Sequence, residues 1–138
     1  MQINYIAVVA CAILSMVMGF LWYGPIFGKK WMELSGIKMK SPEDKEKMEK
    51  SAGTLYAVQF LLSLFQVYVL AYLISCWPGA SGVKLGLFLW AGFIMTTVAG
   101  SCMWNGDMPR VAWNKFLIQA IYQLIMFVLF GLILTSWP

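Results

Sequence analysis

Four long segments of this chain contain no Lys, Arg, Asp or Glu, and they constrain the fold more than any other feature. They cover residues 1–28, 51–83, 85–106 and 116–138. A helix of about 20 apolar residues spans the hydrocarbon core of a bilayer, so each segment is long enough to cross it. Of all 138 residues, 61% are hydrophobic and only 12% are charged, too few for a water-soluble fold of this length. The sequence therefore predicts an integral membrane protein.

The spans are predicted to be α-helices, which form an all-α four-helix bundle in a single transmembrane domain over residues 1–138. Backbone polar groups in lipid must be paired within a helix or around a closed barrel. The apolar segments lack the alternating polarity of barrel strands, so helices are the remaining choice. We expect the spans at about 3–23, 55–77, 85–104 and 116–137.

The basic residues lie on one side of this topology. Nine of the ten Lys and Arg residues fall in the first and third connections, and only Lys84 falls at the second. Because cation-rich loops stay in the cytoplasm, loop 24–54 and the third loop are predicted to be cytoplasmic, with both termini outside. We expect a bacterial inner (plasma) membrane. The net charge of +4 is interpreted as a sign of topology rather than of nucleic-acid binding.

Aromatic residues cluster near the predicted ends of the spans, as in the belts that anchor membrane proteins at the lipid–water interface. Of the seven tryptophans, only Trp90 falls inside a span. The predicted belt consists of Tyr5, Trp22, Tyr23, Trp31, Trp77, Trp104, Trp113 and Trp137.

Gly24 and Pro25 are expected to end the first helix, because the residue before proline avoids the α conformation. A short amphipathic helix should follow in the cytoplasmic interface, with Phe27, Trp31 and Leu34 on one face.

The second helix is predicted to begin outside the membrane. Ser41 and Pro42 fit a helix start, as the N-cap and the first helical residue. A helix from Pro42 to Trp77 would be longer than the bilayer core, and Gly53 is the expected break.

A tryptophan motif occurs twice. Trp-x-Gly, six further residues and a second Trp begin at Trp22 and again at Trp104. Both copies close an odd-numbered span, which favours two helical hairpins related by an axis along the membrane normal. The alternative is coincidence, because tryptophans gather at interfaces in any membrane protein.

Small residues recur every four positions on the first and third spans, and helices in lipid associate through such stripes. We expect them to pack these two helices against each other. The alternative is a face for self-association, in a homo-oligomer or a larger membrane complex. The first stripe is Ala7, Cys11, Ser15 and Gly19, and the second is Gly92, Thr96 and Gly100.

The second and fourth spans carry several amide and phenol side chains. Hydrogen bonds between them could tie the two helices together, at about 0.6–2 kcal/mol each. Alternatively they line a polar path or pocket, because polar groups facing a bundle interior mark substrate routes. The candidate residues are Gln59, Gln66, Gln119, Tyr122 and Gln123.

The third loop contains the only acidic residue outside the first loop. Asp107 is expected to cap the fourth helix and to pair with Arg110. The functional alternative is a cytoplasmic-face site for an anionic head group or partner protein, formed by Asp107 and Arg110 with Lys29 and Lys30.

Common catalytic arrangements are missing from the sequence. The chain has no histidine, and its three cysteines lie in different spans, which excludes zinc fingers, haem–histidine ligation and a Cys–His nucleophile pair. We therefore expect no enzyme activity, no metal and no cofactor, with membrane lipids as the surrounding partners.

Residues 19–32, GFLWYGPIFGKKWM, form the most specific motif of the chain. With residues 116–118, Tyr122, Gly131 and Trp137, this motif resembles the family of small bacterial and fungal membrane proteins catalogued as domain of unknown function 1761. That family often has a glycine where this chain has Ile121. The resemblance implies a four-helix membrane protein and no particular activity, cofactor or catalytic residue.

Three functions fit the sequence. The first is a non-enzymatic subunit that self-associates or joins a larger complex. The second is a small oligomeric transporter or channel with a polar path along the second and fourth helices. The third is a membrane enzyme that acts on a lipophilic substrate at the cytoplasmic face.

Overall fold

The computed structural model describes residues 2–34 and 42–137. Within these residues, four helices are long and apolar enough to cross a membrane. Their number confirms the prediction of four helical spans, and the last begins earlier than predicted. The four spans are Tyr5–Ile26, Ala52–Cys76, Gly82–Met103 and Pro109–Ser136.

Two of the spans contain a π-helical turn. The first consists of α1 (Tyr5–Leu21) and the turn η1 (Trp22–Ile26), and the short helix α2 (Gly28–Leu34) follows it. The second belongs to α3 (Pro42–Cys76). The third consists of α4 (Gly82–Leu89), the turn η2 (Trp90–Ile94) and α5 (Met95–Met103), and the fourth is α6 (Pro109–Ser136).

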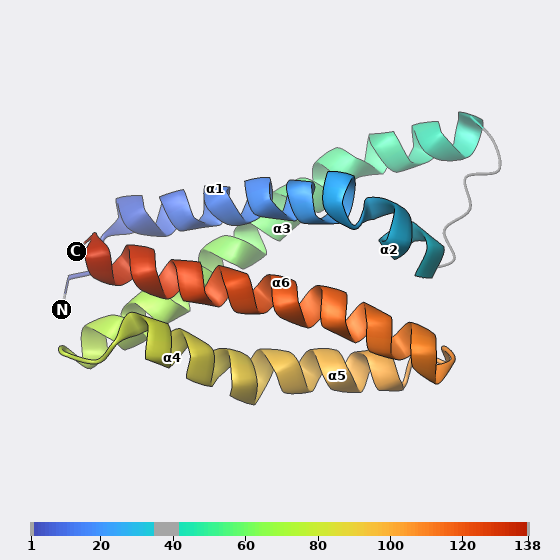
Figure 1. Ribbon diagram of the computed structural model, residues 1–138. Coiled ribbons are helices and arrows are strands. Elements are labelled where there is room, and N and C mark those ends of the chain that lie inside the picture. The colour runs from blue at the N-terminus through green and yellow to red at the C-terminus, as the bar shows by residue number, and fades with distance from the viewer. Residues whose placement is uncertain (1, 35–41, 138) are drawn as a thin grey trace.

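Helix α6 lies between α1 and the continuous rod of α4 and α5, and α3 crosses these helices at an oblique angle (Figure 1). Both termini lie at one end of the bundle, which we call the terminal end. There the Asn4 side-chain amide donates to the carbonyl of Trp137 at 3.3 Å. Helix α2 and the α5–α6 connection lie at the opposite end, the loop end.

Large apolar side chains cover the outer surface of the spans. The exposed fraction is 77% for Phe88, 70% for Ile6 and 69% for Phe65. A water-soluble monomer rarely exposes such residues over a wide area, whereas lipid solvates them without cost. The chain is therefore an integral membrane protein.

The buried core lies in the terminal half of the bundle. Val8 and Cys11 of α1 meet Val67 and Leu70 of α3, and aromatic residues of α6 complete the cluster. All of these residues are at most 4% exposed. The core therefore joins α1, α3 and α6. It lies between the terminal end and the loop end of the bundle.

Glycines bring α4 and α6 into backbone contact. A Cβ atom added to Gly82 would lie 2.6 Å from the carbonyl oxygen of Gly131, and one added to Gly86 would lie 2.8 Å from that of Phe127. Close approach of this kind is how small residues associate helices in lipid. The α4–α6 interface therefore requires glycine at these positions.

The two π-helical turns share a sequence pattern, Trp-x-Gly-x-Ile, and a contact with α6. The indole N–H of Trp22 donates to the carbonyl of Ile118 at 3.1 Å, and that of Trp90 donates to Ala120 at 2.9 Å. Trp104, the predicted counterpart of Trp22, instead ends α5 and is 84% exposed. Trp22 thus resembles Trp90 in local structure, and it is half-buried rather than part of an exposed belt.

Two predicted helix boundaries were wrong. The first span does not end at Gly24 and Pro25, because the wider turn η1 accommodates the proline ring and runs on to Ile26. Helix α3 does not break at Gly53, because a glycine costs only about 1 kcal/mol in a long helix. Its start at Pro42 agrees with the prediction, and the predicted cap Ser41 lies outside the described residues.

Candidate functional site

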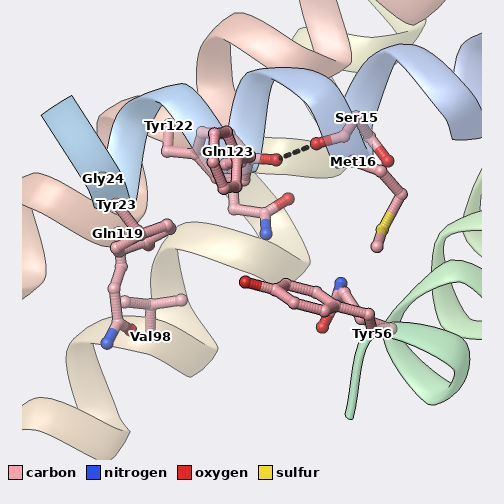
Figure 2. Close-up of a pocket in the computed structure, with 12 residues that line it drawn as sticks. Ser15, Met16, Tyr23, Gly24, Tyr56, Val98, Gln119, Tyr122 and Gln123 are labelled. Carbon is pink, nitrogen blue, oxygen red and sulfur yellow. Dashed lines mark hydrogen bonds between the residues drawn. The ribbon is translucent and has the colours of Figure 1, made fainter. Parts of the chain in front are cut away.

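A cleft of about 450 Å³ opens between α1, α3, α5 and α6 in the loop half of the bundle. We call it the polar cleft. Its walls come from four helices that are distant in sequence, and Figure 2 shows their side chains directed toward one space. The lining residues are Ser15, Met16, Gly19, Phe20, Tyr23, Gly24, Tyr56, Gln59, Val98, Gln119, Tyr122 and Gln123.

The structure brings together four of the five residues predicted to form a polar path. Gln59, Gln119, Tyr122 and Gln123 all line the polar cleft. Gln66 lies further along α3 and lines a neighbouring groove instead.

Tyr23 and Tyr56 add two phenol groups to the cleft, of which only Tyr23 lies outside the second and fourth spans that were predicted to line a polar path. Tyr56 reaches in from α3, opposite Gln123 of α6 (Figure 2). Tyr23 had been assigned to the aromatic belt, because its position at the end of a span fits both roles. The π-helical turn η1 contains Tyr23 and forms this wall of the cleft.

Tyr122 is the most firmly held of the polar residues. Its hydroxyl donates to the backbone carbonyl of Ser15 at 2.7 Å, and its ring packs edge-on against Tyr23 at 5.6 Å between centroids. A Cβ atom added to Gly19 would lie 2.9 Å from the hydroxyl oxygen. Gly19 thus makes room for Tyr122, which has a structural role in the wall.

The glutamine amides are held less tightly. The amide of Gln59 donates to the Ser63 hydroxyl at a long 3.4 Å. The side-chain amides of Gln119 and Gln123 form no hydrogen bond with any described residue. An amide in an apolar medium costs several kcal/mol if it stays unpaired. These groups are therefore suited to bind water or a ligand, each with donors and an acceptor.

The polar cleft has no charge in its walls. None of the described residues that line it is Lys, Arg, Asp or Glu. An ionic ligand would lose its hydration there without gaining a counter-charge. The cleft therefore favours uncharged molecules that form hydrogen bonds.

Both structural roles predicted for Asp107, pairing with Arg110 and capping α6, were wrong. Asp107 pairs with Lys115 at 2.9 Å rather than with Arg110, and Lys115 is nearly buried. Asp107 also does not cap α6, whose N-cap residue is Met108 without a side-chain hydrogen bond. Lys115 lies on the inward face of α6, so its ammonium can reach back to the preceding loop. Lys29 and Lys30 are exposed on α2.

The buried core closes the polar cleft toward the terminal end. On α6, the cleft residues 119–123 precede the core residues 126–130, which precede a separate cavity near Leu134 and Trp137. On α1 the order is reversed, as expected for an antiparallel helix. The core thus separates the polar cleft from the cavity at the terminal end.

The two small-residue stripes have different environments. Ala7, Cys11 and Ser15 are buried in the first span, which packs against α3 and α6. In the third span, Gly92 and Thr96 are exposed, and a Cβ atom at Gly92 would meet nothing within 4 Å. The same is true of a Cβ atom at Gly100. The prediction that the stripes pack the first and third helices together was wrong, because the third span packs on α6 through Gly82 and Gly86.

Four apolar helices around an uncharged cleft define a helical integral membrane protein. The chain belongs to the family described as Protein of unknown function (DUF1761), whose model matches residues 6–135, nearly the whole chain. This match confirms the resemblance found in the sequence. A search of curated proteins and a search of solved structures each gave no match.

Proposed function

We propose that this chain is a non-enzymatic membrane protein that binds a small uncharged molecule in the polar cleft. The observation that carries the proposal is the convergence of three glutamine amides and the Tyr56 phenol in one uncharged cleft between membrane-spanning helices. Polar groups are costly in lipid, so their concentration at one site favours a binding role over packing alone.

Two arrangements support uptake of the ligand from the loop end. Residues 53–59 of α3 are all exposed, so this part of the helix leaves the cleft open. The core closes the other end. With loops one and three in the cytoplasm, as the positive-inside rule predicts, the cleft would open toward the cytoplasmic half of a bacterial inner membrane. Transport would require α3 to move against the core.

Mass spectrometry of small molecules retained by the protein tests this proposal. Protein in lipid nanodiscs is compared with empty nanodiscs, and the extracted neutral molecules are quantified. We expect at least one to be enriched on the wild type and lost from Gln119→Leu/Gln123→Leu, which removes the unpaired amides but keeps side-chain volume. Tyr72→Phe, at an exposed position outside the cleft on the same helix as Gln59, is the matched control. Equal retention by the wild type and the double variant contradicts the proposal.

A second proposal is self-association through the exposed stripe of the third span, which would make the protein a homo-oligomer or an accessory subunit. Gly92 and Gly100 lie mid-helix, where glycine costs about 1 kcal/mol relative to alanine, yet no neighbour in the described part of the chain requires them. Phe88 extends the same face and is 77% exposed. Close helix contact with another chain would account for these glycines.

Counting of subunits by single-molecule photobleaching in nanodiscs tests self-association. We expect more than one copy per disc for the wild type and a shift to single copies for Gly92→Leu/Gly100→Leu. Gly53→Leu is the matched control, because Gly53 is also exposed with open space around it. Single copies for the wild type at every protein-to-lipid ratio contradict this proposal.

The enzyme alternative has less support. It rests on the four charged residues of the predicted cytoplasmic-face site, and Asp107 already has Lys115 as its partner. A carboxylate held in an ion pair is a weaker candidate for general acid–base chemistry than one with a perturbed environment in a cleft.

A further inference from the structure

A second cavity, of about 470 Å³, lies next to the polar cleft and is lined mainly by apolar side chains. We call it the apolar groove. It lies between α3 on one side and α4, η2 and α6 on the other. Its apolar lining residues are Leu62, Phe65, Val69, Leu70, Leu89, Phe93, Ile94 and Phe127, and its polar ones are Gln59, Gln66 and Gln123.

The polar cleft and the apolar groove share two residues. Gln59 of α3 and Gln123 of α6 line both. Along α6 the groove continues from Gln123 to Phe127, one turn nearer the terminal end. Along α3 it continues past Gln59 to Val69 and Leu70 in the same direction. The two cavities are thus adjoining parts of one site, polar toward the loop end and apolar toward the middle of the bundle.

The second π-helical turn forms one wall of the apolar groove. Phe93 and Ile94 belong to η2, and Trp90 holds this turn against α6 through its hydrogen bond to Ala120. Phe93 is 68% exposed and Phe65 of α3 is 69% exposed. The groove is therefore open to the surface that faces lipid, and a molecule in the bilayer can enter it from the side.

We propose that the ligand is an uncharged amphiphile, with its hydrogen-bonding head group in the polar cleft and its hydrocarbon tail in the apolar groove. The inference rests on the proposed binding function and names the class of its ligand. A lipid of the leaflet at the loop end already has this orientation, with its head toward that end and its tail toward the bilayer centre. It can therefore enter between α3 and η2 without crossing the core.

The absence of charge around the cleft selects among membrane amphiphiles. A phospholipid head would place a phosphate among residues that carry no cation in the described part of the cleft, whereas an alcohol, ester or carbonyl head can pair with the glutamine amides. We therefore expect a glycerolipid without phosphate to bind and its phosphorylated counterpart to bind poorly.

Photolabelling in nanodiscs with a 1-monooleoylglycerol analogue that carries a diazirine in its acyl chain tests the inference. We expect labelled peptides from α3, η2 and α6. Excess monooleoylglycerol should compete, whereas lysophosphatidate with the same acyl chain, and free glycerol, should not. Labelling that lysophosphatidate displaces equally well, or that is spread evenly over the lipid-facing surface, overturns the inference.

Photolabelling of variants in the apolar groove is the second test of the inference. Phe65→Ala/Phe93→Ala removes two exposed rings from the groove and should lower labelling about tenfold, because contact with the tail is lost. Tyr72→Ala removes an exposed ring of α3 outside the groove and should leave labelling unchanged. Equal labelling of the groove double variant and the Tyr72 control contradicts tail binding in the groove.

The two levels of the proposal can fail separately. If the molecule retained by the wild type is polar and lacks a hydrocarbon chain, and Gln119→Leu/Gln123→Leu loses it, the amphiphile inference fails while the binding function stands. If the wild type retains no neutral molecule and the double glutamine variant is labelled as strongly as the wild type, the binding function fails as well.

Discussion

The chain forms two helical hairpins, the first from α1 and α3 and the second from the α4–α5 rod and α6. They differ in how far along their length the helices touch. In the second hairpin, α6 packs against α4, η2 and α5, with glycine contacts near the terminal end and the Asp107–Lys115 pair at the loop end. In the first hairpin, the residues of α3 described as buried all lie in its terminal half, and they include Ser63, Val67 and Leu70.

This difference shows where the molecule is fixed and where it is open. Small residues permit backbone contact, and the part-buried pair of Asp107 and Lys115 closes the end of the second hairpin. The described residues in the loop half of α3 make no such contacts, and this half carries Tyr56 and Gln59 toward the polar cleft. The polar cleft thus results from one hairpin packing along its whole length and the other along half of it.

The largest effect is expected for Asp107→Asn. It leaves the nearly buried ammonium of Lys115 without its counter-charge and should lower the free energy of unfolding by about 3 kcal/mol. Reversible unfolding in mixed micelles with increasing SDS measures this change. The double variant Asp107→Asn/Lys115→Met should recover most of the loss, and Lys30→Gln on exposed α2 should have little effect. If Lys30→Gln lowered stability as much as Asp107→Asn, the ion pair would be no more important for stability than an exposed lysine.

Gly86→Ala tests the backbone contact of the packed hairpin. The added Cβ atom would lie 2.8 Å from the Phe127 carbonyl oxygen, so α4 and α6 must separate, at about 2 kcal/mol. Gly92→Ala in the same span is the control and should be neutral or stabilising in a monomer, because its Cβ atom meets nothing within 4 Å. The same SDS titration applies. Equal stability of Gly86→Ala and the wild type would mean that α4 is not held tightly on α6.

Comparison of Tyr122→Phe with Tyr56→Phe distinguishes a phenol that stabilises the fold from one that binds the ligand. Loss of the 2.7 Å hydrogen bond to Ser15 should cost about 1 kcal/mol of stability. Tyr56→Phe, on the open part of α3, should leave stability unchanged and reduce retention of the neutral ligand. Unfolding and the nanodisc retention assay measure the two effects. A stability loss for Tyr56→Phe as large as for Tyr122→Phe would show that α3 closes on the cleft.

Gly53→Ala has the smallest expected effect and tests the openness of α3. A Cβ atom there meets nothing within 4 Å, so the change should stabilise the helix by up to about 1 kcal/mol. Amide hydrogen exchange at residues 52–58 should slow correspondingly. Destabilisation by this substitution would indicate a close neighbour at this turn of α3.

The local pattern of the sequence was enough to predict the helical spans but not the partners of their residues. The predicted stripe at Gly92 has the same spacing as the pair Gly82 and Gly86, yet only the latter packs on α6. Asp107 was assigned to Arg110, three residues away, whereas Lys115 lies on the side of α6 that faces the loop. Spacing along one helix cannot tell which face meets another helix.

The candidate site shows the same limit. Four glutamines were predicted as a group, and three of them converge in the polar cleft, because Gln59, Gln119 and Gln123 lie at the same depth in the bundle. Gln66 lies about two turns further along α3 and faces the apolar groove. The position of each glutamine along its helix followed from the sequence. The oblique crossing of α3 decided which cavity each side chain enters.

The sequence by itself determined that the helices lie in a lipid bilayer, how many spans there are and approximately where they end. The reason is that the cost of placing charge in lipid depends on composition over about 20 consecutive residues. Only the tertiary structure decided which glycines touch another helix, which charges pair, and that a polar cleft adjoins an apolar groove. These features depend on the angle and depth at which helices cross, and those follow from side-chain packing between segments distant in sequence.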